Sequence, residues 1–209
     1  MTDQSTARPA DDQVDDDTVA PQETSAQRAR RTRILEATLE LARSGGYEAV
    51  QMRAVAEMSE VALGTLYRYF PSKVHLLVSA MASQLEQMRT SLQRRTIPGD
   101  SRLERVAYVL ERSTRSLQRN PNLTEAMVRA MMAADASVAA EVTAVRAQMG
   151  ELIIKALRNG SGAQPDDEAL AGILQDVWFA RQIAWLGGRI GTDEVWREIE
   201  QAIELVLRR

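Results

Sequence analysis

The side chains of this 209-residue chain that are best suited to bind another molecule through charge and hydrogen bonds lie between positions 51 and 73. Arg53, Thr65, Tyr67, Tyr69 and Lys73 supply cationic and hydroxyl groups in that stretch. Groups of this kind donate hydrogen bonds to phosphate oxygens and to base edges in the DNA grooves. The stretch is therefore a candidate for DNA recognition.

Two short helices would position these side chains. Residues 52–57 suit one helix, with Val55 and Ala56 on its inner side, and a second helix would carry Thr65 and its neighbours. Residues 58–60 are the polar break between the two, so the segment is predicted to be a helix, a three-residue turn and a helix. Pro71 cannot continue the second helix and suits the start of a third.

Four arginines, at positions 28, 30, 31 and 33, stand at the start of an earlier helix expected over residues 26–43. Positive charge is disfavoured at a helix N-terminus, so a phosphate-facing role is one interpretation and a solvated helix end is the other. For Tyr67, the alternative to a DNA contact is an aromatic side chain in the core. For Gly64, the alternative is a weakly packed helix start. The residues predicted to contact DNA are Arg28, Arg31, Gln51, Arg53, Leu63, Gly64, Thr65, Tyr67, Arg68, Tyr69 and Lys73.

Composition excludes several other kinds of chemistry. The chain has no cysteine and one histidine, His75, so disulfides, thiolate metal sites and a histidine-based triad are not expected. No arrangement of a nucleophile with an acid–base pair is apparent, so we expect no enzyme activity, no metal and no cofactor. There is no apolar run of membrane-spanning length and the N-terminus is acidic, which predicts a cytoplasmic protein without a membrane segment.

Charge is distributed unevenly along the chain. Residues 1–25 hold one basic and seven acidic residues, residues 26–75 hold eight and five, and residues 76–209 hold seventeen of each, which sums to −3. A basic segment in a mildly acidic protein is typical of a DNA reader joined to a second domain. We therefore predict a disordered acidic arm at 1–25, a helix-turn-helix domain at 26–73 and a ligand-binding and dimerisation domain at 74–209.

Apolar residues after position 73 recur at spacings of three and four, which indicates long helices. Pro98, Asn120-Pro121 and Asn159–Gly162 would end three of them. The fold class is predicted to be all-α, with three helices in the N-terminal domain and about nine in total.

Five flexible or aromatic residues and four aliphatic ones in the predicted helices could surround an apolar effector, because methionine adapts to irregular ligand shapes. An apolar stripe at helical spacing is as readily explained as core. The predicted ligand-binding residues are Met81, Leu85, Met88, Val106, Leu110, Met127, Met131, Trp178 and Ile183.

The last two helices, expected at 166–186 and 192–207, are apolar on more than one side and so need two packing partners. A second copy of the chain would supply one, giving a homodimer whose two reading helices lie about 34 Å apart on a palindromic operator. The predicted interface residues are Ile173, Val177, Ala184, Trp185, Val195, Ile199, Ile203 and Val206.

The run Thr65-Leu66-Tyr67, followed by Phe70 and Lys73, resembles the end of the helix-turn-helix in the TetR family of bacterial repressors. Two positions depart from that pattern. Glu60 replaces the turn glycine, which costs roughly 1 kcal/mol if φ there is positive, and Gln51 is a weaker N-cap than the usual Thr or Ser. The resemblance implies a DNA-binding regulator that responds to a small molecule.

Longer runs resemble the steroid-catabolism repressors of that family: Gly45–Ala56, Gly64–Ala80, Gln118–Met127, Ala134–Ser137 and Asp176–Trp178. This resemblance implies repression of sterol or lipid catabolism genes, with release by an apolar effector, in that group a coenzyme A thioester of a cholesterol breakdown product. The alternative is a helical partner-binding or ligand-carrier protein without DNA binding.

Overall fold

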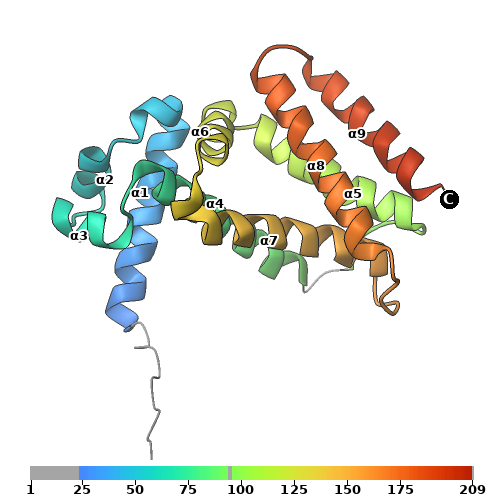
Figure 1. Cartoon of the computed structure of the whole chain (residues 1–209), viewed down its shortest axis with the longest axis horizontal. Coiled ribbons are helices and arrows are strands. Elements are labelled where there is room, and N and C mark those ends of the chain that lie inside the picture. The colour runs from blue at the N-terminus through green and yellow to red at the C-terminus, as the bar shows by residue number, and fades with distance from the viewer. Residues whose placement is uncertain (1–23, 94–95, 209) are drawn as a thin grey trace, which may run out of the picture.

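The computed structural model describes residues 24–93 and 96–208, and in this part of the chain it has nine α-helices, one short 3₁₀ helix and no strand (Figure 1). The prediction of an all-α fold is confirmed. Residues 1–23, which make up most of the expected acidic arm, lie outside the described residues.

The N-terminal helices are α1 (Ser25–Ala49), α2 (Met52–Met58) and α3 (Leu63–Tyr69). A capping box starts α1: the Thr24 hydroxyl accepts the N–H of Gln27, and the Gln27 side chain accepts the N–H of Thr24. The helix is interrupted at Gly45 (φ −150°) and at Gly46 (φ 66°), and one further turn follows. The sequence predicts that this helix ends near residue 43, and it does not predict the extra turn after the two glycines.

The turn between α2 and α3 contains Glu60 at φ 55°. A side chain in this left-handed region is strained, as the sequence predicts for a residue that replaces glycine. Ser59 offsets part of that cost because its hydroxyl donates to the Val55 carbonyl at 2.6 Å, and the Val61 N–H donates to the Ala56 carbonyl at 3.0 Å. The turn is thus held by hydrogen bonds on both sides of the strained residue.

The longer helices follow as α4 (Lys73–Gln93), α5 (Arg102–Gln118), α6 (Pro121–Met132), the 3₁₀ helix η1 (Ala136–Val138), α7 (Ala139–Arg158), α8 (Asp167–Leu186) and α9 (Thr192–Leu207). Their ends follow from local chemistry. Ser101 and Glu104 form a capping box on α5, Pro121 occupies the first turn of α6, and Asn159 ends α7 in a left-handed conformation.

The buried apolar side chains form two clusters. One joins helices α1 through α4 with α6 and the first part of α7, and includes Leu66, Leu77 and Ala126. The other joins α5, the rest of α7, α8 and α9, and includes Leu110, Ile153 and Ile199. Helix α6 therefore packs with the N-terminal helices, although it follows α5 in the chain. In Figure 1, α2 and α3 lie at one end of the long axis of the molecule and α9 lies at the other.

The structure corrects part of the predicted dimer interface. Val195, Ile199 and Ile203 are 0%, 1% and 0% exposed because this stripe of α9 packs on α5 and α8 of its own chain, and Ala184 is buried as well. These four side chains cannot meet a second chain. Ile173 is 51% exposed, and Val177, Trp185 and Val206 are half-buried.

Within the described residues, none of the helices combines the length and the apolar character needed to cross a membrane.

Candidate DNA interface and effector pocket

Helices α2 and α3 carry the predicted DNA-contact residues on a buried base. Leu66 is 0% exposed and Phe70 2% exposed, so these two side chains fix α3 against the N-terminal core. The outward side chains then follow from helical geometry. Gln51, Arg53, Gly64, Tyr67 and Arg68 are exposed, whereas Leu63, Thr65 and Tyr69 are half-buried.

Tyr67 is 47% exposed, so the structure does not support its alternative as a core aromatic. Arg53 is exposed and forms no ion pair in the described part of the chain. Around Gly64, no atom lies within 4 Å of the place where a Cβ would stand. The surface of α3 is therefore open to an approaching groove.

The start of α1 lies beside the end of α3. Gln27, Arg68 and Tyr69 line one shared hollow, and the guanidinium of Arg31 lies 5.6 Å from the centre of the Phe70 ring. Arg28 is exposed on the same first turns of α1. The arginines of α1 and the polar residues of α3 thus belong to one basic surface, which suits phosphate contacts on both sides of a reading helix.

Lys73, the first residue of α4, is less free than the sequence suggests. Its ammonium lies 3.9 Å from the centre of the Tyr47 ring, and the Arg129 guanidinium lies 4.3 Å from the same centre. Burial lowers the pKa of Lys73 below its usual value, although Glu48 opposes the shift. Lys73 therefore ties α4 to the end of α1 through a cation–π contact.

Helix α6 docks on the break in α1. The Glu125 carboxylate accepts the backbone N–H of Tyr47 at 2.9 Å and pairs with Arg129 at 2.9 Å, while Arg129 also pairs with Glu48 at 2.9 Å. The positive φ of Gly46 requires glycine, and a Cβ there would lie 2.8 Å from the Glu125 carboxylate, which would have to move away from its partners. We call the set Gly46, Tyr47, Glu48, Glu125 and Arg129 the α1–α6 joint.

A hollow of about 560 Å³ lies where the two apolar clusters meet. Met81, Leu85 and Met127 reach it from the first cluster, and Met149 and Trp178 from the second. The Trp178 ring is fixed because its Nε1 donates to the Thr114 hydroxyl at 3.0 Å. The volume lies within the range of roughly 300–1,000 Å³ that is common for ligand pockets.

Five of the nine predicted ligand-binding residues line this pocket: Met81, Leu85, Met88, Met127 and Trp178. The other four do not, which corrects the prediction for this cavity. Val106 and Leu110 are 0% exposed because they face the core side of α5, Met131 packs with the N-terminal cluster, and Ile183 is half-buried further along α8.

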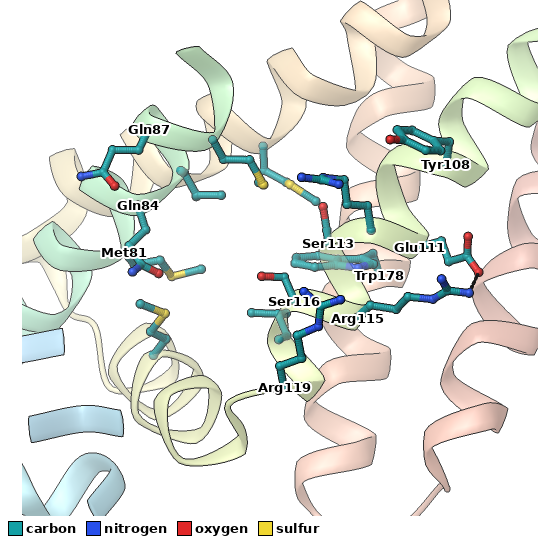
Figure 2. Close-up of a pocket in the computed structure, with 16 residues that line it drawn as sticks. Met81, Gln84, Gln87, Tyr108, Glu111, Ser113, Arg115, Ser116, Arg119 and Trp178 are labelled. Atoms are coloured by element: carbon teal, nitrogen blue, oxygen red, sulfur yellow. Dashed lines mark hydrogen bonds and ion pairs between the residues drawn. The ribbon is translucent and has the colours of Figure 1, made fainter. Parts of the chain in front are cut away.

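The pocket also has a polar side, which the sequence prediction does not include. Figure 2 shows Met81, Gln84 and Gln87 of α4 on one side of the hollow and Ser116 and Arg119 of α5 on the other. The remaining lining residues are Tyr108, Glu111, Arg112, Ser113, Arg115 and Leu117. In the sequence, the arginines at 112, 115 and 119 fall on one face of a helix, a pattern that suits a solvated face equally well.

No group of three or more His, Cys, Asp or Glu side chains suited to hold a metal ion occurs in residues 24–93 and 96–208. The site is thus an open basic surface and an apolar pocket with a polar rim, linked by α4, α6 and the α1–α6 joint.

Comparison with known proteins identifies the family. Residues 34–80 match the model described as "Bacterial regulatory proteins, tetR family", and residues 99–206 match "Tetracyclin repressor-like, C-terminal domain". The chain belongs to the TetR family. It is a transcriptional regulator and not an enzyme.

Curated relatives include the HTH-type transcriptional repressor KstR of Rhodococcus jostii, which is 51% identical over 183 residues, 88% of this chain and 85% of the relative. KstR of Mycobacterium tuberculosis is 44% identical over 182 residues, 87% of this chain and 82% of the relative. The resemblance of the longer sequence runs to one group of TetR-family repressors is confirmed by these relatives.

Solved structures share the fold. A TetR transcriptional regulator from Rhodococcus sp. RHA1 matches with a TM-score of 0.79 at 34% identity, covering 87% of this chain and 97% of that one. FadR of Thermus thermophilus, solved in complex with lauroyl-CoA, matches with a TM-score of 0.70 at 24% identity, covering 85% and 93%.

Proposed function

We propose that this TetR-family regulator represses genes of sterol or lipid catabolism as a homodimer on a palindromic operator, and that an apolar effector, a steroid-derived CoA thioester, releases it. The observation that carries the proposal is the 560 Å³ pocket between the two apolar clusters, one of which contains the DNA-reading helix. A guest in that position contacts both clusters at once. It would act in the cytoplasm, where bacterial DNA lies.

Four further points support the identity of the effector. The relatives named KstR cover most of the chain, and the runs that resemble steroid-catabolism repressors include Asp176–Trp178, which supplies a pocket residue. The fold itself accommodates an acyl-CoA, as the Thermus thermophilus FadR complex illustrates for that protein. An apolar interior of methionine, leucine and tryptophan side chains suits a steroid body.

The mechanism follows from the connections of the pocket. In the free dimer, the two α3 helices are held about 34 Å apart, which matches successive major grooves. An effector between α4 and α8 contacts Met81 and Leu85 on α4 and Met127 on α6. A shift of α4 or α6 then moves the N-terminal helices through Lys73 and the α1–α6 joint, so that the spacing no longer fits the operator.

The energy required is modest. Weakening of DNA binding by ten- to a hundredfold needs about 1.4–2.8 kcal/mol of coupling between the two sites. The effector must bind the spread arrangement more tightly than the operator-competent one by that amount.

The test uses DNA fragments that the purified protein retains from bacterial genomic DNA. Sequencing these fragments identifies the operator, and fluorescence anisotropy then measures its affinity with and without the CoA thioester of a steroid side-chain acid. We expect the thioester to weaken binding at least tenfold. Unchanged affinity would reject this effector class.

Salt dependence tests the regulator itself. Affinity for the retained fragment should fall steeply as salt rises, because phosphate contacts release counterions. Arg53→Ala should weaken DNA affinity and leave thermal unfolding unchanged. Arg189 is an exposed arginine in the α8–α9 connection, so Arg189→Ala should leave DNA affinity unchanged. A protein that retains no genomic fragment would be a helical carrier or partner-binding protein instead.

A further inference from the structure

Three arginines along one face of α5 and its C-terminal cap line the pocket: Arg112 and Arg115 in the helix, and Arg119 directly after its last residue. Their spacing of three and four residues places them along one stripe of the helix, and all three are exposed. Seven residues of α-helix span about 10 Å, so the stripe is a basic strip of that length at the rim of an apolar hollow. Figure 2 shows Arg115 and Arg119 beside Ser116.

Part of the positive charge of this strip is uncompensated. Arg115 pairs with Glu111 at 2.5 Å, whereas Arg112 and Arg119 form no ion pair within the described residues. Other exposed arginines of the C-terminal helices are paired, for example Arg146 with Asp176 on α8. At Arg112 and Arg119, the strip therefore presents positive charge that no carboxylate of the described residues offsets.

A second hollow, of about 190 Å³, adjoins the strip between α5 and α9. Glu111 and Arg115 line both hollows, and Trp196 and Thr192 line the second one. A ligand that extends out of the main pocket across α5 therefore contacts Arg115 and can continue into the second hollow.

Guanidinium groups bind phosphate through paired, charge-assisted hydrogen bonds. A ligand that is apolar at one end and phosphorylated at the other would satisfy both sides of the pocket. The nucleotide of coenzyme A carries a pyrophosphate and a separate ribose phosphate a few ångströms apart, which a basic strip about 10 Å long can contact together. At Arg115, the phosphate would take the place of the Glu111 carboxylate as the partner of the guanidinium.

We propose that Arg112, Arg115 and Arg119 bind the phosphates of the effector's coenzyme A moiety while its apolar body lies against Met81 and Trp178. This assignment rests on the proposed function and adds to it a specificity element. The protein distinguishes a CoA thioester from the free acid and from unphosphorylated thioesters by the α5 arginines.

Isothermal titration calorimetry compares three probes on the full chain: the CoA thioester of a steroid side-chain acid, the pantetheine thioester of the same acid, and the free acid. The wild type should bind the CoA thioester most tightly. Arg112→Gln/Arg115→Gln/Arg119→Gln should bind it about 10- to 100-fold more weakly, as expected for the loss of hydrogen bonds between charged groups. Its affinity for the pantetheine thioester should be unchanged.

Arg189→Gln is the matched control, because Arg189 is an exposed arginine outside both hollows and without an ion pair in the described residues. It should behave as the wild type. If the triple variant binds DNA without effector as the wild type does, it is folded. The double variant Arg112→Gln/Arg119→Gln keeps the Arg115–Glu111 pair, and it should lose part of the preference for the CoA thioester over the pantetheine thioester.

The outcomes separate the two proposals. If the triple variant binds the CoA thioester as tightly as the wild type, the phosphate assignment is wrong and the proposed function stands. If the wild type binds none of the three probes, the proposed effector class is wrong, and the assignment fails with it.

Discussion

Gly64 is a position at which nothing inside the chain requires glycine. It lies in the first turn of α3, is exposed, and has no atom within 4 Å of the place that a Cβ would take, so we expect that close contact with DNA is what favours glycine there. Gly64→Ala should raise the free energy of unfolding by about 0.5–1 kcal/mol. It should weaken DNA binding at least about fivefold, as an added methyl does in a close contact.

Chemical denaturation and anisotropy on a retained genomic fragment measure these two effects of opposite sign. The control is Gly150→Ala in α7, where a Cβ would meet only the Gln175 side chain, at 3.6 Å. It should stabilise the protein to a similar extent and leave DNA affinity unchanged. Equal DNA affinities of the Gly64 variant and the wild type would show that α3 does not approach DNA closely at this point.

Asp167 is the buried charge with the clearest link between pH and stability. It is 1% exposed, accepts the Gln164 N–H at 2.9 Å, and pairs with Arg158 at 2.8 Å and Arg102 at 2.6 Å. The Gln164 hydrogen bond, followed by Arg158, holds the pKa of this carboxyl below its usual value. Because the folded-state pKa is lowered, its contribution is complete above the unfolded value of about 4 and is lost as pH falls through the folded-state pKa.

Asp167→Asn should lower the free energy of unfolding at pH 7 by about 1–3 kcal/mol, since two arginines lose the charge that accepts their hydrogen bonds. It should also flatten the loss of stability below pH 4. Urea unfolding between pH 3 and 7 tests this, with Asp166→Asn as control, because Asp166 is exposed and its side chain makes no capping hydrogen bond. Parallel pH profiles for the Asp167 variant and the wild type would contradict the assignment.

At the scale of helices, periodicity and caps predict the elements well because both are local. The Ser101 capping box, Pro121 and Asn159 each act within a few residues, and the observed bounds of α5 to α9 follow them closely. What periodicity cannot show is which apolar face meets which neighbour. The stripe at Val195, Ile199 and Ile203 is as apolar as an interface, and only the arrangement of helices shows that it packs on α5.

The α1–α6 joint shows the same limit. Tyr47 and Glu125 are 78 residues apart in sequence, and no spacing rule predicts that a carboxylate on α6 accepts a backbone N–H at the break in α1. The rim of the pocket was missed for a different reason. Arginines at helical spacing usually form a solvated face, so their sequence pattern alone does not single them out.

The joint should carry part of the coupling between effector and DNA. Arg129→Gln removes the ion pair to Glu48, which joins α6 to α1, together with the ion pair to Glu125 inside α6. We expect it to reduce the ratio of operator affinities without and with effector by about 2- to 30-fold, the range for residues that modulate coupling by roughly 0.5–2 kcal/mol. The effector's own affinity should change little, because Arg129 does not line the pocket.

Arg146→Gln is the matched control, since Arg146 is exposed to a similar degree, 48% against 46%, and pairs across α7 and α8 rather than across the joint. Anisotropy titrations of the operator with and without the thioester measure the ratio for each variant. A ratio in Arg129→Gln equal to that of the wild type would mean that the signal travels through α4 alone.

At the scale of the whole molecule, the apolar surface that remains exposed on α8 and α9 lies far from the reading helix (Figure 1). Ile173 is 51% exposed and Leu205 is 71% exposed, on the faces opposite the buried stripes of their helices. A dimer formed through this surface leaves both α3 helices free to contact DNA. Since one short helix reads few base pairs, joining two of them raises affinity by about 10²–10⁴.

Ile173→Glu/Leu205→Glu should therefore yield a monomer of 23.2 kDa in sedimentation equilibrium and lose at least about a hundredfold in operator affinity. Charges buried at a former apolar contact oppose association, because nothing there neutralises them. Met132→Glu, at a 65% exposed apolar residue on α6, should remain dimeric and bind DNA as the wild type does. A double variant that stays dimeric would place the interface elsewhere, and a wild type that is monomeric yet binds DNA tightly would remove the reason for a palindromic operator.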